Sequence, residues 1–104
     1  MVVRSWRGYG AFAEQDAYPR HLLQIVRPKL EQLPGFRGLY LLRRHHPDEV
    51  EFLVLTLWDS MEAVRAFAGD QPEVAVVEPE GRAGLVRYDV LVSHYEVVAS
   101  PGQP

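Results

Sequence analysis

The segment EVEFLVLTLW, residues 49–58, decides the fold of this chain. Side chains alternate between the two sides of a β-strand, so a strand with one solvated face carries a polar residue at every second position. Here both sets are apolar, with Val50, Phe52, Val54 and Trp58 on one side and Leu53, Leu55 and Leu57 on the other. The segment is therefore predicted to be a strand that is covered on both faces.

Leaving one of these faces in water would forfeit a large stabilising contribution, because burial of a Leu or Val side chain is worth about 1.5–3 kcal/mol. An exposed apolar patch of this size usually marks an interface. The simplest cover for the second face is another copy of the same chain, related by a two-fold axis. We therefore expect a homodimer in which two sheets face each other.

The sequence before this segment predicts a strand, a helix and a second strand. Residues 36–45 form a strand that joins residues 49–58 through a short turn, which makes a β-hairpin. Residues 16–33 carry apolar side chains at helical spacing, with Asp16 as the expected N-cap. Pro28 lies inside this helix and should kink or divide it near Arg27. Residues 2–9 are rich in β-favouring side chains and predict the first strand.

The sequence after residue 58 predicts one more helix and one more strand. Asp59-Ser60 should cap a helix over residues 61–68 that ends at Gly69. Residues 71–82 are compatible with either a short helix or a loop, since two prolines limit any helix there. Residues 85–98 alternate in polarity and predict the last strand.

The resulting βαββαβ order is typical of the ferredoxin-like α+β fold, an antiparallel sheet with both helices on one face. With 104 residues the chain has the length of one domain, which we expect to span residues 1–98. Residues 99–104 are expected to form a disordered tail.

Composition excludes several classes of function. The chain has no cysteine, so it has no disulfide, iron–sulfur cluster, thiolate zinc site or cysteine nucleophile. Its formal charge of −3 argues against nucleic-acid binding, and no apolar run approaches the ~20 residues of a membrane span. The adjacent His45 and His46 would point to opposite faces of a strand, so no metal site is expected. A charged residue occurs too early in the sequence for the apolar core of a signal peptide, so we expect a cytoplasmic location. We also expect a small-molecule ligand.

Particular residues, in this order of elements, resemble those of the antibiotic biosynthesis monooxygenase (ABM) superfamily of dimeric α+β barrels. They are Trp6-Arg7-Gly8, LPGFRG at residues 33–38, EFLVLTLWDS at residues 51–60, AFAG at residues 66–69 and His94-Tyr95-Glu96. The resemblance spans nearly the whole chain. The fold and dimer that it implies agree with the burial argument, which was made without it.

The resemblance implies a function as well as a fold. Some members oxidise aromatic, hydroquinone-like substrates with neither metal nor flavin, and others degrade haem. We expect a cofactor-independent monooxygenase-like protein, a possible oxidoreductase that needs no cofactor and acts on a small aromatic or enolisable compound. The alternative is a non-catalytic dimeric module of the same fold that binds a small ligand or serves as a scaffold. Haem degradation is disfavoured, because the first strand lacks the asparagine of that branch and residues 61–84 contain no histidine to ligate iron.

His94 on the last strand is the candidate catalytic base, since a histidine titrating near neutral pH could take a phenolic proton. Its structural alternative is a strand-end histidine bonded to a neighbour or to water. Trp58 occupies the position at which the haem-degrading branch places a pocket tryptophan. Its alternative is a core tryptophan at the corner between strand and helix.

Four further residues are predicted to bind substrate. Trp6, Tyr88 and Tyr40 would supply aromatic walls and orient a phenol, although core tyrosines with solvated hydroxyls need no such role. Arg4 would hold a developing anion, and its alternative is a solvated arginine at a strand edge. His21 lies beside the apolar stripe of the first helix, which favours the helix surface or a pocket rim.

Overall fold

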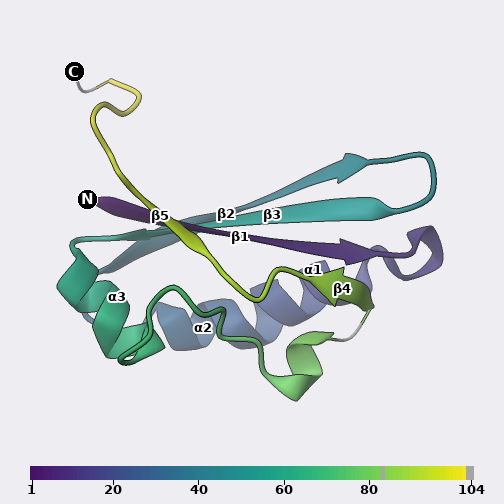
Figure 1. The fold of residues 1–104 in the computed structure, drawn as a ribbon, viewed down its shortest axis with the longest axis horizontal. Helices are drawn as coiled ribbons and strands as arrows, with labels where there is room; N and C mark the ends of the chain where they lie inside the picture. Colours follow the sequence, from purple (N-terminus) through teal and green to yellow (C-terminus); the bar gives the residue numbers. More distant parts are fainter. Residues whose placement is uncertain (83, 103–104) are drawn as a thin grey trace.

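The fold is an antiparallel five-stranded sheet with its helices on one face (Figure 1), and the computed structural model describes residues 1–82 and 84–102. The strands are β1 (Val2–Gly10), β2 (Phe36–His45), β3 (Val50–Trp58), β4 (Leu85–Tyr88) and β5 (Ser93–Glu96). Their order is β2-β3-β1-β4, and β5 also pairs with β1. The predicted ferredoxin-like α+β fold is therefore confirmed.

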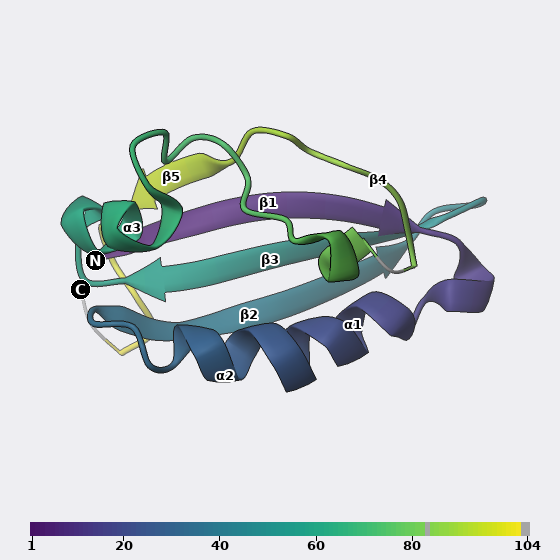
Figure 2. The ribbon, with the colours of Figure 1, turned by 90° about the horizontal axis from the view of Figure 1, so that it is seen from below.

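The first helical segment is one rod that runs along the sheet (Figure 2). It consists of α1 (Ala17–His21), a π-helical turn (Leu22–Val26) and α2 (Arg27–Leu30). The irregularity falls next to Pro28, where the sequence predicted a kink, and the Arg27 amide reaches back five residues to the Leu22 carbonyl. Asp16 is the N-cap residue of α1, as predicted, but its carboxylate accepts no bond from this helix.

The second helix, α3 (Met61–Ala68), has the predicted bounds. Ser60 Oγ accepts a hydrogen bond from the Ala63 amide at 3.2 Å, and the helix ends at Gly69 with φ of 87°.

The core lies between β3 and the helices. Val50, Phe52 and Trp58 of β3 are fully buried there, together with Val64 of α3. A bulge in β2, marked by Gly38 at φ of 127°, moves Leu39 and Leu41 onto this face and turns Tyr40 to the other.

The last strand is divided, which corrects the prediction of one strand over residues 85–98. Gly8 pairs with Tyr88, and Ser5 pairs with Ser93. Between these two pairs the last strand therefore has four residues where β1 has two, and the extra residues form a bulge. The bulged residues pair with the segment before them: the Ala75 amide donates to the Val90 carbonyl at 2.9 Å. Residues 71–78 are thereby an extended loop, followed by a 3₁₀ turn at Pro79–Arg82. Of the predicted tail, residues 103–104 lie outside the described residues.

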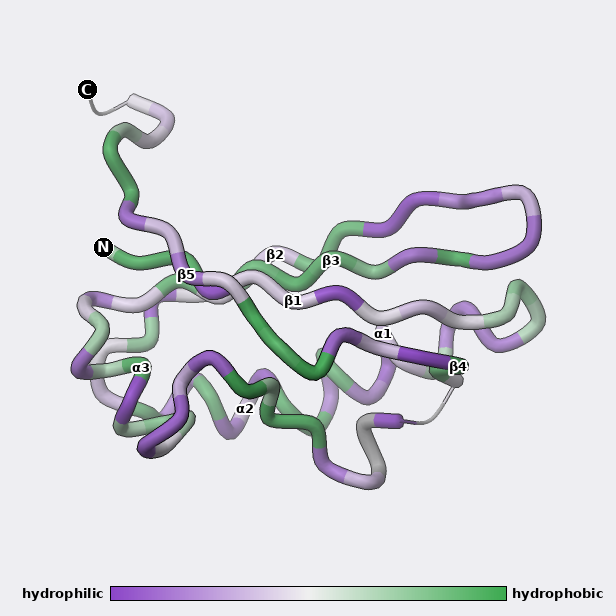
Figure 3. The backbone as a smooth tube through the Cα atoms, in the orientation of Figure 1, coloured by the Kyte–Doolittle hydropathy of each residue, from purple (hydrophilic) through white to green (hydrophobic). Residues whose placement is uncertain are grey.

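The outer face of the sheet, which no helix covers, has an apolar end and a polar end. Tyr40 and Tyr95 are more than half exposed there, and Leu55 and Leu57 are partly exposed. Toward the β2–β3 hairpin the backbone carries hydrophilic residues (Figure 3). The structure describes a single chain, so the homodimer stays a prediction.

The turn between α2 and β2 depends on Gly35, and this dependence can be measured. Gly35 has φ of 83°, and an added Cβ would lie 2.6 Å from Ala63 Cβ, whereas Gly69 has φ of 87° with nothing within 4 Å of such an atom. Gly69→Ala should cost about 1–3 kcal/mol of unfolding free energy through backbone strain alone, because its φ of 87° and ψ of −160° form a conformation open essentially to glycine. Gly35→Ala should cost about 1–3 kcal/mol more, because it also overpacks the contact with α3. Urea unfolding measures both, and equal losses would contradict this account.

Candidate functional site

A cavity of about 270 Å³ lies between the first helical rod and the helix-facing side of the sheet. Trp6 and Val54 line it from the sheet, Leu22 and Val26 line it from the rod, and Val76 lines it from the loop over residues 71–78. The cavity is mostly apolar, because its walls come from the core faces of these elements. The loop that closes it is itself held by the bulge between β4 and β5.

Arg4 is the buried charged group in this wall, with 5% of its surface exposed. It projects from β1, donates from Nη1 to the Pro72 carbonyl and donates from Nη2 to the Val74 carbonyl at 3.0 Å. Its guanidinium also lies 5.7 Å from the centre of the Phe67 ring. Burial lowers the pKa of Arg4, but a guanidinium stays charged in proteins. No carboxylate of the described residues forms an ion pair with it.

His94 lies directly behind Arg4, with its Nε2 atom 3.0 Å from Arg4 Nη1. A guanidinium can only donate, so Nε2 accepts and the proton of the neutral ring is on Nδ1. Burial lowers the pKa of His94, and the Arg4 charge lowers it further, while Glu73 opposes the shift. His94 is therefore neutral at physiological pH and helps to orient Arg4.

The other predicted site residues are distributed over three places. Trp6 lines the cavity and donates from Nε1 to the Asp89 carbonyl at 2.9 Å. Tyr88 packs against Trp6 with ring centres 6.0 Å apart and is not part of the cavity wall. Trp58 is fully buried behind the wall, where it donates to Thr56 Oγ1 at 2.9 Å and stacks on Phe67.

Tyr40 lies on the outer face of the sheet, away from the cavity, and is 57% exposed. In one chain it therefore cannot contact a ligand in this cavity. Among the predicted residues, the structure brings Arg4 and Trp6 together in the wall and places His94 one contact behind them.

Several residues that line the cavity were not predicted as site residues from the sequence. His21 lies in the wall, on the turn of helix that also carries Tyr18 and Leu22. Its spacing of three residues from Tyr18 placed it next to the apolar stripe, and this was the available signal. Lys29 of the rod and Glu78 of the loop form an ion pair of 3.8 Å and also line the cavity. No sequence pattern pointed to that pair, because the two residues are far apart in the chain.

The described residues include no group of three histidine or acidic side chains that could hold a metal ion. Among their helices, none is long and apolar enough to cross a membrane.

The family model for antibiotic biosynthesis monooxygenases matches residues 12–79. The chain belongs to this family. The match covers the first helical rod, the β2–β3 hairpin, α3 and the whole cavity loop over residues 71–78. It therefore includes most of the elements that enclose the cavity.

Solved structures agree with this assignment. A Bacillus cereus protein described as an antibiotic biosynthesis monooxygenase is 16% identical and has a TM-score of 0.62, covering 96% of this chain and 94% of that chain. A Deinococcus radiodurans protein of the same description is 18% identical with a TM-score of 0.61, covering 96% and 95%. These likenesses show the fold of the ABM family members.

A third similar structure is a variant of MhuD, the haem degrader of Mycobacterium tuberculosis, with two manganese protoporphyrin IX molecules per active site. It is 25% identical with a TM-score of 0.61, covering 96% of this chain and 97% of that chain. A sequence search among curated proteins finds no match.

The cavity loop should depend on Arg4. Arg4→Met keeps the apolar stem but removes the donors to Pro72 and Val74, so the loop should open more often. We expect faster hydrogen exchange at the Ala75 and Val92 amides, which pair across the loop and the bulge. Arg20→Met, at an exposed position of α1, is the control and should leave these rates unchanged. Unaltered exchange in Arg4→Met would show that the loop is held by other contacts.

Proposed function

We propose that this chain is a cofactor-independent monooxygenase-like protein whose substrate is a small aromatic or enolisable compound that binds as an anion. The observation that carries this proposal is a buried guanidinium in an apolar cavity, with no ion-pair partner among the described residues. An uncompensated charge is costly to bury, and a bound anion would offset that cost.

The dimensions of the cavity support a ligand of this class. Its volume of about 270 Å³ is close to the lower end of the ~300–1,000 Å³ range of small-molecule sites. An aromatic ligand of a few rings would place its apolar body against Trp6, Val54 and Leu22. Its acidic oxygen would then approach Arg4.

Oxygenation without a cofactor requires the substrate to supply the electrons. A phenol or enol becomes a sufficient donor when it loses its proton, and Arg4 would stabilise the anion that forms. The anion passes electrons to molecular oxygen and binds it at carbon as a peroxide. Loss of water then leaves a new carbonyl, so one oxygen atom enters the product and the other leaves in water.

Two histidines are available to accept the substrate proton. His94 is the base that the sequence predicted, and its neutral state supports that role, although its Nε2 atom is already bonded to Arg4. His21 lies in the cavity wall itself and is better placed to meet a ligand. We propose that His21 takes the proton and that His94 positions Arg4.

Haem, the group held by the MhuD neighbour, fits this cavity poorly. A volume of about 270 Å³ suits a smaller molecule than a pair of porphyrins. Residues 61–84 contain no histidine, and His94 has its Nε2 atom engaged by Arg4. The proposed reaction therefore involves no haem.

The second candidate function is a binding module without turnover. It is favoured by the bond between His94 and Arg4, which occupies the predicted base. Such a module would hold the same anionic ligand in the same cavity but would consume no oxygen.

Oxygen uptake with a panel of hydroquinones and anthrones separates the two candidates. We expect wild-type turnover of at least one panel member and a rate about 10²-fold lower in Arg4→Met and in His21→Ala. His94→Ala should also lower the rate, because it releases Arg4. The exposed hairpin residue His45 gives the control His45→Ala, which should retain wild-type turnover. Ligand binding without oxygen uptake in the wild type would overturn the enzyme and support the binding module.

We also propose that the outer face of the sheet joins two copies of the chain, as the apolar pattern of β3 predicts. Its support is the apolar end of that face, where Tyr40, Leu55 and Leu57 are accessible in one chain.

Light scattering tests this association. The wild type should have twice the 11.9 kDa mass of one chain, and Tyr40→Asp should reduce the mass to that of one chain. Ile25→Asp removes a comparably exposed apolar residue from the helical rod and should leave the dimer intact. A wild-type species of one chain at micromolar concentration would contradict the proposal.

A further inference from the structure

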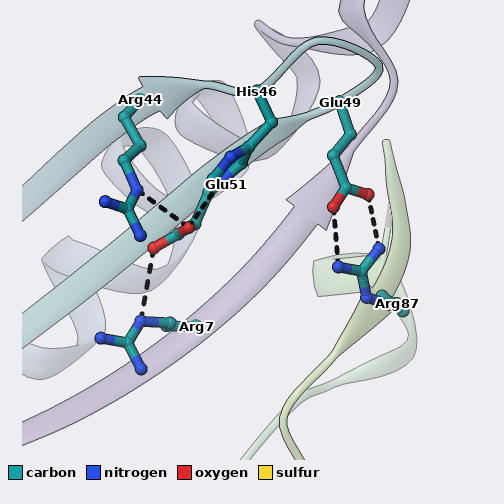
Figure 4. A network of polar contacts seen from close by, with 6 residues as sticks. All are labelled: Arg7, Arg44, His46, Glu49, Glu51 and Arg87. Atoms are coloured by element: carbon teal, nitrogen blue, oxygen red, sulfur yellow. Dashed lines mark hydrogen bonds and ion pairs between the residues drawn. The ribbon is translucent and has the colours of Figure 1, made fainter.

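The polar end of the outer face contains a second cluster, separate from the cavity, in which one carboxylate holds two arginines (Figure 4). Arg7 Nε forms an ion pair of 3.3 Å with Glu51 Oε2, and Arg44 Nε donates a hydrogen bond to Glu51 Oε1 at 3.0 Å. His46 Nε2 lies 2.7 Å from the same Oε1 atom. The Glu51 side chain is buried, with 7% exposed, and the hydrogen bonds with His46 and with Arg44 hold the pKa of its carboxyl below the usual range, although desolvation opposes this shift.

Each arginine approaches Glu51 through Nε, which leaves its outer nitrogens available. Among the described residues, no hydrogen bond engages the η nitrogens of Arg7 or Arg44. Their side chains are 50% and 69% exposed, so these nitrogens are solvated. In Figure 4 the two guanidinium groups flank the Glu51 carboxylate, one from β1 and one from β2.

Arg7, Arg44 and Glu51 bound a hollow of about 260 Å³, which Leu42, Leu53 and Arg43 also line. Arg43 pairs with Asp16 at 3.5 Å, whereas Arg7 and Arg44 share one carboxylate, so the hollow is positive although the whole chain has a formal charge of −3. An apolar lining beside two fixed guanidinium groups suits an anion that carries an organic part. Because Glu51 already fixes both Nε atoms, less side-chain entropy is lost when a ligand binds the η nitrogens.

We propose that Arg7 and Arg44, held by Glu51, form a second ligand site that binds a phosphate-type oxyanion. A guanidinium binds an oxyanion through two parallel hydrogen bonds. A carboxylate has two oxygens and satisfies one such fork, whereas a phosphate has enough free oxygens to bridge two. The site lies on the face opposite the cavity and does not depend on the proposed oxygenation.

Calorimetric titration with inorganic phosphate tests this site, with sodium chloride of equal ionic strength as the reference, since exposed ion pairs are screened by salt. The wild type should bind phosphate, and Arg7→Gln or Arg44→Gln should weaken binding at least about tenfold. Arg20→Gln removes the same charge from an exposed position of α1 and should bind as the wild type does. Acetate should bind more weakly than phosphate.

In this titration, three results would overturn the site, and a fourth comes from a dimer variant. The three are no binding beyond the chloride reference, an equal loss in Arg20→Gln, and acetate binding as tight as that of phosphate. The Tyr40→Asp variant separates this proposal from the dimer. Phosphate binding that persists in it supports a site formed by one chain, and binding that disappears with the dimer overturns that site.

Discussion

The guanidinium of Arg4 connects the regular part of the fold to its irregular part. Arg4 lies near the start of β1 and donates to two carbonyls of a loop that has little secondary structure of its own. On its other side it contacts His94 of β5, so one side chain links the sheet, the loop and the last strand. A charge buried at 5% exposure is retained only where its donors are satisfied. Without it, the loop over residues 71–78 would lose two of the hydrogen bonds that hold it over the cavity.

The two faces of the sheet carry different sites. On the helix-facing side the side chains of β1 and β3 are buried, and the space left beside the helical rod forms the cavity. On the outer side, the same strands present apolar residues near one end and the Glu51 cluster near the other. Successive side chains of a strand point to opposite faces, so residues three positions apart lie on different faces. Arg4 and Arg7 therefore belong to different sites although both are on β1.

Local patterns in the sequence were sufficient for most of the fold. The hairpin, α3 and its Ser60 cap are defined by nearby turn and capping residues and by the spacing of apolar side chains. Their predicted bounds are confirmed within a residue. The break in the last strand could not be predicted, because it depends on pairing between residues 73–75 and the bulge. The face of Tyr40 is set by the bulge at Gly38, which reverses the alternation after Phe36. For the site, the alternation of side chains along β1 predicts that Arg4 and Trp6 share one face of the sheet. The Lys29–Glu78 pair could not be predicted in this way, because it is formed only by the tertiary structure.

The protonation state of His94 gives the most direct test of the contact with Arg4. Nitrogen-15 NMR distinguishes an imidazole nitrogen that accepts a hydrogen bond from one that carries a proton. If Arg4 donates to Nε2, His94 is neutral at neutral pH with its proton on Nδ1, and it gains a second proton only below the usual histidine range. In Arg4→Met this titration should move upward, toward the value of a free histidine. A doubly protonated His94 at neutral pH in the wild type would contradict the contact and the anion site that depends on it.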